Sequence, residues 1–358
     1  MDSLELFKNY YLEEKELLDK KLDELNNKLL VEDNLLIKDN IKLLTNLNSD
    51  GKLIRGVLVD LGYYLMKNDR SYSNSLALAY EMFQTAILVH DDIIDNDLKR
   101  RGKDTIHFAN SKKYEKYSND TNEVKHLSDS VAICMGDYGL YEANKIVCDN
   151  YSDNSNLGKI LSNFNNTVLT TIRGELIDVL LPFHGKHNLL DVSEIDDNIL
   201  EIYRLKTAYY TIIGPLSVGI LLGGGDDKKL EDIKQFGEKV GIAFQIQDDI
   251  LGIYSNEMGK VKGSDIKEYK QTILYSYVLN TKYKDELLKY YGNDNIDDDI
   301  VLKVQNIFKK SGAYDHAYEL MNKLYDAGEL ILSNIKWIDE DKKELLKGFV
   351  EYLRKRNK

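Results

Sequence analysis

Leucines in the first segment of the chain repeat at the spacing of an amphipathic helix. Leu18, Leu22, Leu25 and Leu29 fall on one stripe, three or four residues apart. The same period recurs later and predicts helices over residues 76–95, 128–150, 157–181, 195–222, 230–253 and 301–332. No sustained run of alternating, β-branched residues indicates a strand. The pattern therefore predicts an all-α fold.

Polar or glycine-rich segments separate the predicted helices. These breaks fall at residues 111–121, 150–156, 223–226 and 292–299. None of them is long enough to link two domains, and no repeat of about 20–50 residues is present. We therefore expect a single domain over residues 1–358. It should be a bundle of roughly ten or more helices.

The composition agrees with a soluble protein that has a sizeable core. Hydrophobic residues make up 43% of the 358 residues, and charged residues make up 30%. The two prolines, Pro182 and Pro215, leave long stretches free of the strongest helix breaker. The formal net charge of −12 argues against nucleic acid as a partner. An anionic ligand would have to be bound by local basic clusters.

The cysteines and the apolar segments indicate neither secretion nor a membrane anchor. Cys134 and Cys148 are too few and too far apart for a disulfide framework or a zinc site. The acidic, amphipathic N-terminus is not typical of a signal peptide. The longest apolar run, residues 211–222, is shorter than the roughly 20 residues that span a bilayer. We expect no membrane span and a cytoplasmic location.

Two aspartate pairs are distinctive because each ends an apolar run and lies near basic residues. Asp91 and Asp92 precede the basic segment 99–101, and Asp248 and Asp249 precede a segment of glycines and lysines. Carboxylates among apolar residues are costly to bury unless a cation compensates them. Such acids beside bases are typical of divalent metal ions that bridge to a phosphorylated ligand.

Helix geometry places the acids of the first pair on a common face. Residues i and i+4 point the same way, so Asp91 and Asp95 share a face, with Asp92 beside them. Mg²⁺ prefers oxygen ligands and commonly binds through one or two carboxylates and a substrate phosphate. Asp248 and Asp249 could form a second acidic shelf. Other acidic runs, at 196–197, 226–227 and 297–299, are interpreted as solvated loops or helix starts.

On these residues, the chain resembles the trans-isoprenyl diphosphate synthases, or polyprenyl synthetases. These prenyltransferases of isoprenoid biosynthesis condense isopentenyl diphosphate with an allylic diphosphate. The resemblance runs from about residue 51 to residue 270. It implies an all-α bundle around a deep central cavity and a homodimer. It also implies that the two aspartate motifs face each other across the cavity mouth.

The resemblance assigns isopentenyl diphosphate to residues before the first motif. Residues 51–55 match the family's GKxxR pattern, which implies that Lys52 and Arg55 bind this substrate. Gln84 occupies the position of a Gln or His for the same ligand. Gly56 stands where the family usually has proline.

Two arginines after the first motif match the family's RRG pattern. The resemblance implies that Arg100 contacts the allylic diphosphate and that Arg101 contacts isopentenyl diphosphate. Asp104 stands where a proline is common. Each of these bases, taken singly, is more often a solvated surface charge. Their joint order and spacing favour the family.

A Lys-Thr pair and a glutamine match the residues that act on the reacting carbons in the family. These are Lys206 and Thr207, and Gln245 in the pattern FQxxDD. The resemblance implies that Thr207 and Gln245 place oxygen dipoles near the allylic cation. The alternative for Lys206 is a surface ion pair with Glu201 or Glu175.

The second aspartate motif departs from the full DDxxD pattern. Its last position is Gly252, so metal binding there depends on Asp248, with Asp249 in support. Lys260 and Lys270 match the lysines that follow this motif in the family. The basic segment 354–358 resembles a C-terminal tail that closes over the site in some members, although a plain surface segment is the commoner explanation.

The resemblance also implies how the charges are shared. About three Mg²⁺ ions would bind the allylic diphosphate as Lewis acids. Their ligands would be Asp91, Asp95 and Asp248, with Asp92 and Asp249 in support and with Arg100, Lys206 and Lys260 around the diphosphate. The released diphosphate is the base for the final proton loss. No side-chain base is needed.

Product length in this family depends on the residues four and five positions before the first motif. Here these are Ile87 and Ala86, and neither is aromatic. The next aromatic residues on that face are Phe83 and Tyr80. One helical turn of about 5.4 Å matches the reach of one isoprene unit. We therefore expect geranylgeranyl diphosphate, the C20 product, with C25 as the nearest rival. The alternative is that both aromatics belong to the ordinary core.

Three other functions remain as alternatives to C20 synthesis. A C15 product would follow if aromatic residues closed the end of the product cavity at positions nearer to the first aspartate motif. A terpene cyclase would need a second motif with Ser or Thr, which is missing after Asp249. A non-catalytic synthase subunit would typically lose one aspartate motif, whereas both are present here.

Overall fold

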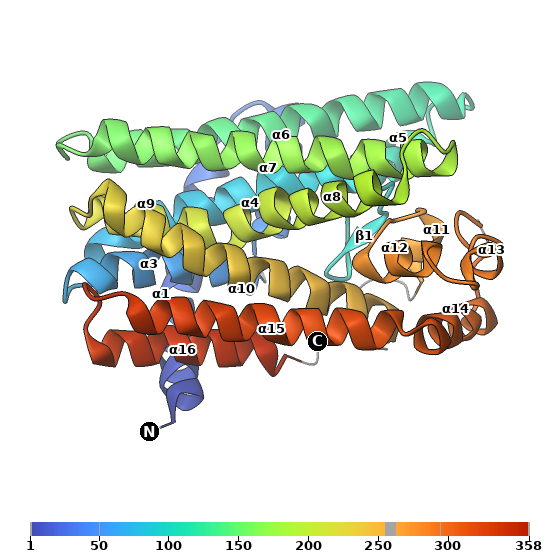
Figure 1. Ribbon diagram of the computed structural model, residues 1–358. Coiled ribbons are helices and arrows are strands. Elements are labelled where there is room, and N and C mark those ends of the chain that lie inside the picture. The colour runs from blue at the N-terminus through green and yellow to red at the C-terminus, as the bar shows by residue number, and fades with distance from the viewer. Residues whose placement is uncertain (1, 50, 255–262, 294, 357–358) are drawn as a thin grey trace. The chain divides into compact units, whose positions relative to one another are not determined.

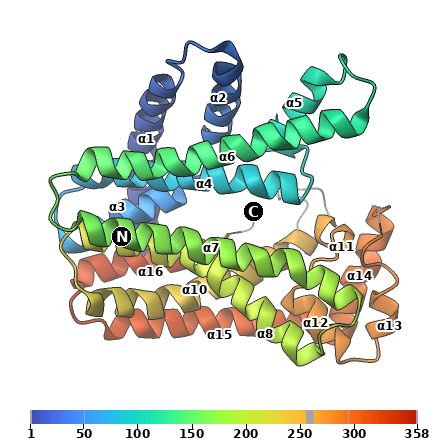
Figure 2. The same cartoon turned by 90° about the horizontal axis from the view of Figure 1, so that it is seen from above.

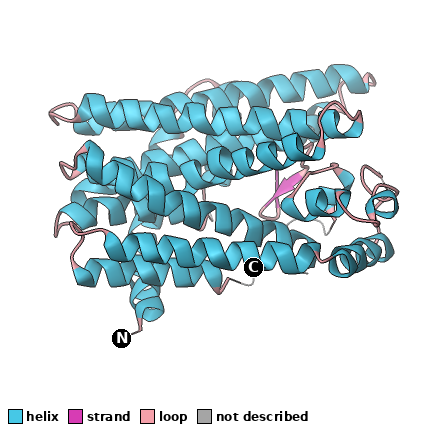
Figure 3. Ribbon diagram, viewed as in Figure 1, coloured by secondary structure: helices cyan, strands magenta, loops and turns pink. Residues whose placement is uncertain are grey.

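Helices make up nearly all of the regular structure. The computed structural model describes residues 2–49, 51–254, 263–293 and 295–356. Over these residues, the strands are the pair β1 (Lys99–Arg100) and β2 (Lys103–Asp104), drawn as arrows in Figure 3. The predicted all-α fold is therefore confirmed. The chain divides into two compact units, each described by itself. The single domain over residues 1–358 stays a prediction.

The first compact unit consists of residues 10–164 and 215–225, and we call it the N-terminal unit. In this unit α4 packs against α3 and α6, and Figures 1 and 2 show α4 and α6 side by side. Asn34 and Asp120 cap α2 and α6 by accepting hydrogen bonds from backbone N–H groups. The elements are α1 (Ser3–Leu29) from Tyr10 onward, α2 (Leu35–Asn48), α3 (Ile54–Met66), the 3₁₀ turn η1 (Ser71–Ser73), α4 (Asn74–Ile94), β1, β2, α5 (Ile106–Tyr114), α6 (Thr121–Tyr151), the start of α7 (Leu157–Lys186) and most of α9 (Gly214–Leu222).

The second compact unit consists of residues 1–9, 165–214 and 226–358, and we call it the C-terminal unit. Here α10 packs against η2, α15 and α16 (Figure 1). A capping box between Asp191 and Glu194 starts α8. The elements are the rest of α7, α8 (Val192–Ile202), η2 (Tyr203–Ile213), α10 (Asp227–Tyr254), α11 (Ser264–Lys267), α12 (Ile273–Leu279), α13 (Lys284–Leu287), α14 (Asp298–Ser311), α15 (Ala313–Asn334) and α16 (Glu340–Arg354).

Small residues allow α3 and α9 to approach each other closely within the N-terminal unit. A Cβ atom on Gly219 would lie 2.1 Å from the carbonyl oxygen of Val59. A Cβ atom on Gly62 would lie 2.3 Å from the carbonyl oxygen of Leu216. Because no side chain fits at either position, the two helix backbones are in direct contact.

Three of the predicted boundaries are wrong. The predicted helix over 301–332 is two helices, because Gly312 adopts a φ of +86° and separates α14 from α15. The predicted loop over 111–121 begins later, since α5 continues to Tyr114. The predicted connector over 292–299 ends earlier, because Asp297 caps α14. The predicted turn over 223–226 is confirmed, with Gly224 at a φ of +89°.

The stretch from α8 to α9 is continuous helix with a π-helical middle. The π-helical part, η2, spans Tyr203–Ile213 and carries Lys206 and Thr207. Such segments are rare and are frequent at functional sites. The stretch Val192–Leu222 is long and apolar enough to cross a membrane, but 89% of its apolar window is buried, as expected of a core helix.

Candidate active site

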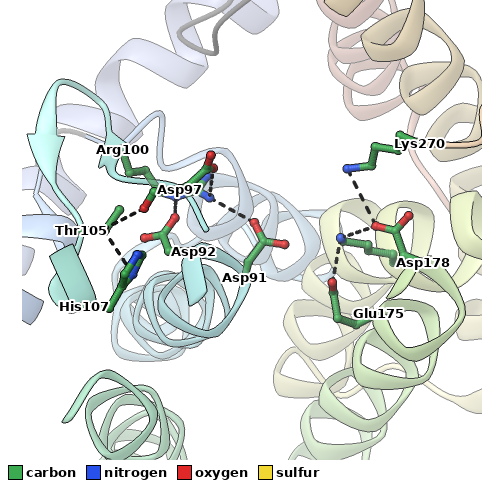
Figure 4. Close-up of polar contacts among 10 residues, drawn as sticks. Asp91, Asp92, Asp97, Arg100, Thr105, His107, Glu175, Asp178 and Lys270 are labelled. Carbon is green, nitrogen blue, oxygen red and sulfur yellow. Dashed lines mark hydrogen bonds and ion pairs between the residues drawn. The ribbon is translucent and has the colours of Figure 1, made fainter. Parts of the chain in front are cut away.

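The carboxylates at the end of α4 converge on one arginine. We call Asp91, Asp92, Asp95 and Asp97 the first acidic cluster. The Nη2 atom of Arg100 lies 3.1 Å from Asp91 Oδ2 and 3.4 Å from Asp97 Oδ2. Its Nε atom donates to Asp92 Oδ1. Figure 4 shows the guanidinium held among these three acids. The structure therefore brings Asp91 and Asp92 together with Arg100, which the resemblance assigns to the allylic diphosphate.

A tight hairpin places Arg100 in this position. Arg100 pairs with Lys103 in the antiparallel β1–β2 ladder. The two residues between them, Arg101 and Gly102, both have positive φ, at 52° and 78°. That combination is typical of a type I′ turn, whose twist matches the two flanking strands. The matched Arg-Arg-Gly segment is thus also the turn that directs its first arginine back to α4.

Asp92 is the most enclosed member of the first acidic cluster. Its side chain is 1% exposed, and Asp92 Oδ2 is buried without a hydrogen-bond partner. Burial raises the pKa of Asp92 to about 7, although the charge and hydrogen bond of Arg100 oppose this increase. A buried carboxylate oxygen without a donor is suited to a cation.

Two of the predicted isopentenyl diphosphate ligands lie around one buried acid. Burial raises the pKa of Glu81, and the positive charges of Arg55 and Arg101 oppose the increase. Lys52 is exposed just before α3, and Gln84 is half-buried one turn after Glu81 on α4. The structure thus gathers Arg55 and Arg101 near Glu81, an acid that the sequence did not single out.

Glu81 also explains why Gly56 replaces the usual proline. The backbone N–H of Gly56 donates to Glu81 Oε1 at 2.7 Å. A proline has no N–H group and would leave this buried oxygen without its donor. The departure at position 56 therefore fits the acid that it faces.

The residues predicted to limit product length are buried in the N-terminal unit. The rings of Tyr80 and Phe83 lie 5.0 Å and 5.7 Å from the ring of Phe164, between centroids. All three side chains are fully buried. Ala86 is also buried, one turn later, while Ile87 is half-buried. Phe164, which sequence reasoning did not single out, completes the aromatic cluster.

The second aspartate motif lies late in α10, in the C-terminal unit. Asp248 and Asp249 form the second acidic cluster. Asp248 Oδ1 accepts a hydrogen bond from Arg356 Nη1 at 2.8 Å. Asp249 is buried and accepts hydrogen bonds from Tyr203 and from Gln245, the latter at 2.9 Å. Burial raises the pKa of Asp249 to about 8, although these two donors oppose the increase.

An acid from another segment lies beside the position that lacks the last aspartate of this motif. A Cβ atom built on Gly252 would lie 3.1 Å from Asp265 Oδ2. The negative charge of Asp265 also raises the pKa of Asp249. Asp265 thus supplies negative charge where the sequence of the motif lacks it. Sequence reasoning assigned it no role because it belongs to α11, outside the motif.

Lys206 lies between two acids of α7. Its Nζ atom is 2.8 Å from Glu175 Oε2 and 2.7 Å from Asp178 Oδ2. Lys270 Nζ lies 3.9 Å from the same oxygen of Asp178 (Figure 4). Sequence reasoning did not assign these acids to the site. Their signal was the i, i+3 spacing of two acids on one face of a largely apolar helix.

The predicted Thr–Gln pair is in direct contact. Thr207 Oγ1 donates to Gln245 Oε1 at 2.5 Å. Glu201, the other acid considered as a surface partner for the lysine, pairs with Arg204 instead, at 2.5 Å. Lys260 lies outside the described residues.

The described part of the C-terminal tail is docked on α10. Gln247 Nε2 donates to the carbonyl oxygens of Arg354 and Arg356, at 3.2 Å and 2.9 Å. Tyr325 Oη donates to Gln247 Oε1 at 2.7 Å. The guanidinium of Arg356 also lies 5.1 Å from the ring centroid of Phe244. The interpretation of this tail as a plain surface segment is therefore wrong for Arg356, whereas the side chain of Arg354 pairs with the exposed acid Asp326.

The carboxylate oxygen atoms of both clusters are suitable ligands for a hard divalent cation. Among the described residues, no three His, Cys, Asp or Glu side chains are placed to hold a metal ion by themselves. Mg²⁺ needs no such cage, because it keeps several waters and binds through one or two carboxylates and substrate phosphates. The carboxylates of Asp91, Asp95 and Asp248, with the orphaned oxygen of Asp92, fit that mode.

Comparison with known proteins assigns the chain to a family. The sequence profile of the polyprenyl synthetase family matches residues 40–308. The geranylgeranyl diphosphate synthase of Saccharolobus solfataricus is 29% identical over 339 residues, which are 90% of this chain and 93% of that protein. The geranylfarnesyl diphosphate synthase of Aeropyrum pernix is 28% identical over 288 residues, 79% of this chain and 82% of that protein.

The fold agrees with this assignment. The crystal structure of a geranylgeranyl pyrophosphate synthase from Corynebacterium glutamicum, complexed with isoprenyl diphosphate and magnesium, superimposes with a TM-score of 0.84. The match covers 95% of this chain and 98% of that one, at 23% identity. The chain therefore belongs to the polyprenyl synthetase family. The predicted enzyme class, a prenyltransferase, is confirmed.

Proposed function

We propose that this enzyme condenses isopentenyl diphosphate with an allylic diphosphate and makes geranylgeranyl diphosphate. The observation that carries the proposal is the pairing of each acidic motif with an arginine, by Arg100 on Asp91 and by Arg356 on Asp248. Each motif therefore has an aspartate that already binds a cationic group. Their arginines occupy the place that a cationic metal–diphosphate group would need.

The allylic diphosphate is bound by metal ions and bases. About three Mg²⁺ ions, when bound, supply the Lewis-acid stabilisation of the departing diphosphate. Asp91, Asp95 and Asp248 are the carboxylates that hold them, with Asp92, Asp249 and Asp265 in support. Arg100, Lys206, Lys260 and Lys270 add positive charge. Glu175 and Asp178 hold the ammonium of Lys206 in a fixed position by the ion pairs described above.

Isopentenyl diphosphate is bound by the bases of the N-terminal unit. Lys52, Arg55 and Arg101 bind its diphosphate, and Gln84 contributes an amide donor. The positive charges of Arg55 and Arg101 both act on the buried Glu81, where they oppose the increase of its pKa. This binding holds the alkene in position for attack, which is a proximity effect.

The bond changes require no base from the protein. The allylic C–O bond breaks, and the alkene of isopentenyl diphosphate forms the new C–C bond. The released diphosphate then takes up the proton that the adduct loses. Thr207 and Gln245 present oxygen atoms to the allylic cation, and the surrounding apolar residues exclude water from it.

The aromatic cluster supports a C20 product. Tyr80, Phe83 and Phe164 are large and fully buried, whereas Ala86, one turn closer to the motif, is a small buried residue beside Gly139 of α6. Relatives of similar identity carry the names of C20 and C25 synthases, so their names do not distinguish the two products. The residues that limit product length in this chain determine which of the two is formed. We also propose that the enzyme is a cytoplasmic homodimer, with twice the mass of the 41.2 kDa chain by light scattering.

The test is a product assay. The protein is incubated with Mg²⁺, isopentenyl diphosphate and each of the C5, C10 and C15 allylic diphosphates, and the products are identified by mass. We expect geranylgeranyl diphosphate as the longest product from every partner. A longer or shorter end product would refute the C20 assignment alone. Diphosphate release from an allylic substrate without isopentenyl diphosphate would indicate a cyclase, and no turnover would indicate a non-catalytic subunit.

A further inference from the structure

A continuous hydrogen-bonded chain runs from α12 through α10 to η2 in the C-terminal unit. The backbone N–H of Ile273 donates to Tyr203 Oη at 3.0 Å, and Tyr203 donates to Asp249 Oδ2. Asp249 Oδ1 accepts from Gln245 Nε2 at 2.9 Å, and Gln245 Oε1 accepts from Thr207 Oγ1 at 2.5 Å. Each side-chain polar atom of Tyr203, Asp249 and Gln245 therefore has a hydrogen-bond partner in this network.

With Asp249 ionised, the order of donors and acceptors fixes a direction along this series of hydrogen bonds. An N–H group can only donate, so the oxygen of Tyr203 accepts from Ile273 and its own hydrogen points to Asp249. The carboxylate then accepts from the amide nitrogen of Gln245, which turns the amide oxygen toward Thr207. That oxygen can only accept, so the hydroxyl hydrogen of Thr207 points at Gln245. The lone pairs of the Thr207 hydroxyl oxygen therefore point away from Gln245.

The direction matters for the allylic cation, so this inference rests on the function proposed above. A hydroxyl that uses its hydrogen internally presents the negative end of its dipole to its surroundings. If the amide of Gln245 were reversed, its nitrogen would face Thr207 and the hydroxyl hydrogen would be released. A positive dipole end would then face a developing positive charge.

Tyr203 is the first residue of η2, four residues before Thr207, and its hydroxyl is bonded to Asp249 rather than to Thr207 or Gln245. It is 3% exposed, and its hydroxyl joins the first turn of α12 to Asp249. The close approach of η2 to α10 is possible because a Cβ atom on Gly241 would lie only 2.4 Å from the Cα atom of Ala208. The hydrogen bonds that link the Tyr203 hydroxyl to Thr207 run through Asp249 and Gln245.

We propose that Tyr203 is a positioning residue, which orients Asp249 and Gln245 so that Thr207 presents its oxygen lone pairs to the allylic cation. Without this hydroxyl, Asp249 would lose one of two donors and could rotate. The amide of Gln245 would then no longer be held in one orientation.

The first test compares Tyr203→Phe with Tyr275→Phe. Tyr275 is a matched control because it is equally buried in the same unit and its hydroxyl is 3.1 Å from Tyr269 Oη, outside this network. We expect Tyr203→Phe to lower kcat about tenfold, with KM for both diphosphates nearly unchanged. Tyr275→Phe should change neither constant. Equal kcat values in Tyr203→Phe and the wild type would refute the proposal.

A double-variant cycle separates positioning from general loss of structure. If Tyr203 acts through Gln245, adding Tyr203→Phe to Gln245→Leu should not lower kcat further. Losses that multiply in the double variant would show that Tyr203 acts by another route, against the proposal. If Tyr203→Phe does not fold, 3-fluorotyrosine at position 203 keeps the hydroxyl and changes its acidity. It should then change kcat at an unchanged Tm, and an unchanged kcat would count against the proposal.

A binding measurement provides a readout that does not depend on turnover. An allylic diphosphate analogue with an ammonium group in place of the reacting carbon carries the charge of the cation. Calorimetry in the presence of Mg²⁺ should show that Tyr203→Phe weakens this analogue about tenfold and leaves unchanged the Kd of the parent allylic diphosphate, whose reacting carbon is uncharged. Equal effects on both ligands would overturn the proposal. Lack of turnover by the wild type would instead refute only the proposed function.

Discussion

The two acidic clusters obtain their compensating charge from different distances along the chain. Arg100, which pairs with Asp92, follows it by eight residues on a tight hairpin. Arg356, which pairs with Asp248, follows it by 108 residues and comes from the C-terminal tail. The first pairing is local and is set by a turn, whereas the second depends on the docking of a distant segment. A nearby turn therefore supplies the positive charge for the first cluster, whereas a distant segment supplies it for the second.

The two clusters also differ in how many carboxylate oxygens of their buried aspartate already have a hydrogen-bond partner. Asp92 has one oxygen paired with Arg100 and one buried oxygen without a partner. Both oxygens of Asp249 accept hydrogen bonds, from Tyr203 and Gln245. A carboxylate with both oxygens satisfied orients its neighbours, whereas one with an orphaned oxygen has capacity for a cation. We infer that Asp249 has mainly an orienting role and that Asp248 is the metal ligand.

The largest predicted effect distinguishes Asp248 from Asp249. Asp91→Asn and Asp248→Asn should each lower kcat by about 10²–10³-fold, because each removes a charge that acts on the departing diphosphate. Both variants should keep the wild-type Tm within a few degrees, since these side chains are partly exposed. Asp249→Asn should lower Tm clearly, because its buried hydrogen bonds are disturbed. Calorimetric scans and steady-state rates check this prediction. An unchanged Tm in Asp249→Asn would contradict the orienting role.

A new carboxylate at position 252 should sharpen the contrast further. Gly252→Asp places a second charge within a few ångströms of Asp265, since the added Cβ atom alone would lie 3.1 Å from Asp265 Oδ2. Like charges at this distance repel each other, so the metal-free protein should lose several degrees of Tm. Saturating Mg²⁺ should restore most of that loss. Gly252→Asn is the neutral control, and an equal loss in that variant would show that size rather than charge is responsible.

The tail pairing predicts a smaller effect on metal affinity. In Arg356→Gln the carboxylate of Asp248 no longer pairs with a guanidinium, so Mg²⁺ need not displace it. We expect the Kd of Mg²⁺ in the presence of an inert allylic diphosphate to fall a few-fold, measured by calorimetry. Lys355→Gln is the control, because this exposed lysine pairs with Glu351 at 3.1 Å. A weaker affinity in Arg356→Gln would show that the arginine helps to bind the metal–diphosphate group.

The smallest predicted effect is a pH dependence that arises in the first cluster. Burial raises the pKa of Asp92 from 3.8 to about 7, so the folded protein holds this proton more tightly than the unfolded chain. The contribution of Asp92 to stability is therefore full below its unfolded pKa and decreases as the pH rises toward 7. We expect the Tm of the metal-free enzyme to fall from pH 5 to pH 8, and to fall less in Asp92→Asn. An equal slope in both proteins would contradict the raised pKa.

Helical periodicity explains how much of this could be predicted from the sequence. The apolar repeat over 76–95 predicts α4 and therefore places Asp91 and Asp95 on one face. The hairpin around Arg101 and Gly102, which turns Arg100 back toward these acids, was not predicted, although it depends only on local turn chemistry. These features depend on residues within about three helical turns of each other.

The features that could not be predicted all depend on distant contacts. Asp265 lies beside Gly252 because α11 packs near the end of α10, and no periodicity carries that information. Asp178 reaches Lys206 from another helix, beside Glu175, which the sequence indicated only as a possible surface partner. The docked position of Arg356 depends on Gln247 and Tyr325, which are far from the tail in the sequence. Local patterns define helices and motifs, whereas tertiary packing decides which side chains meet.

The proposed function requires Asp91 and Asp248 to hold one metal–diphosphate group. The most direct test measures the Kd of an inert allylic thiolodiphosphate in saturating Mg²⁺ for the wild type, Asp91→Asn, Asp248→Asn and the double variant. Residues that hold a common group are coupled, so the double variant should lose much less binding free energy than the sum of the two single losses. Losses that add fully in the double variant would contradict the claim.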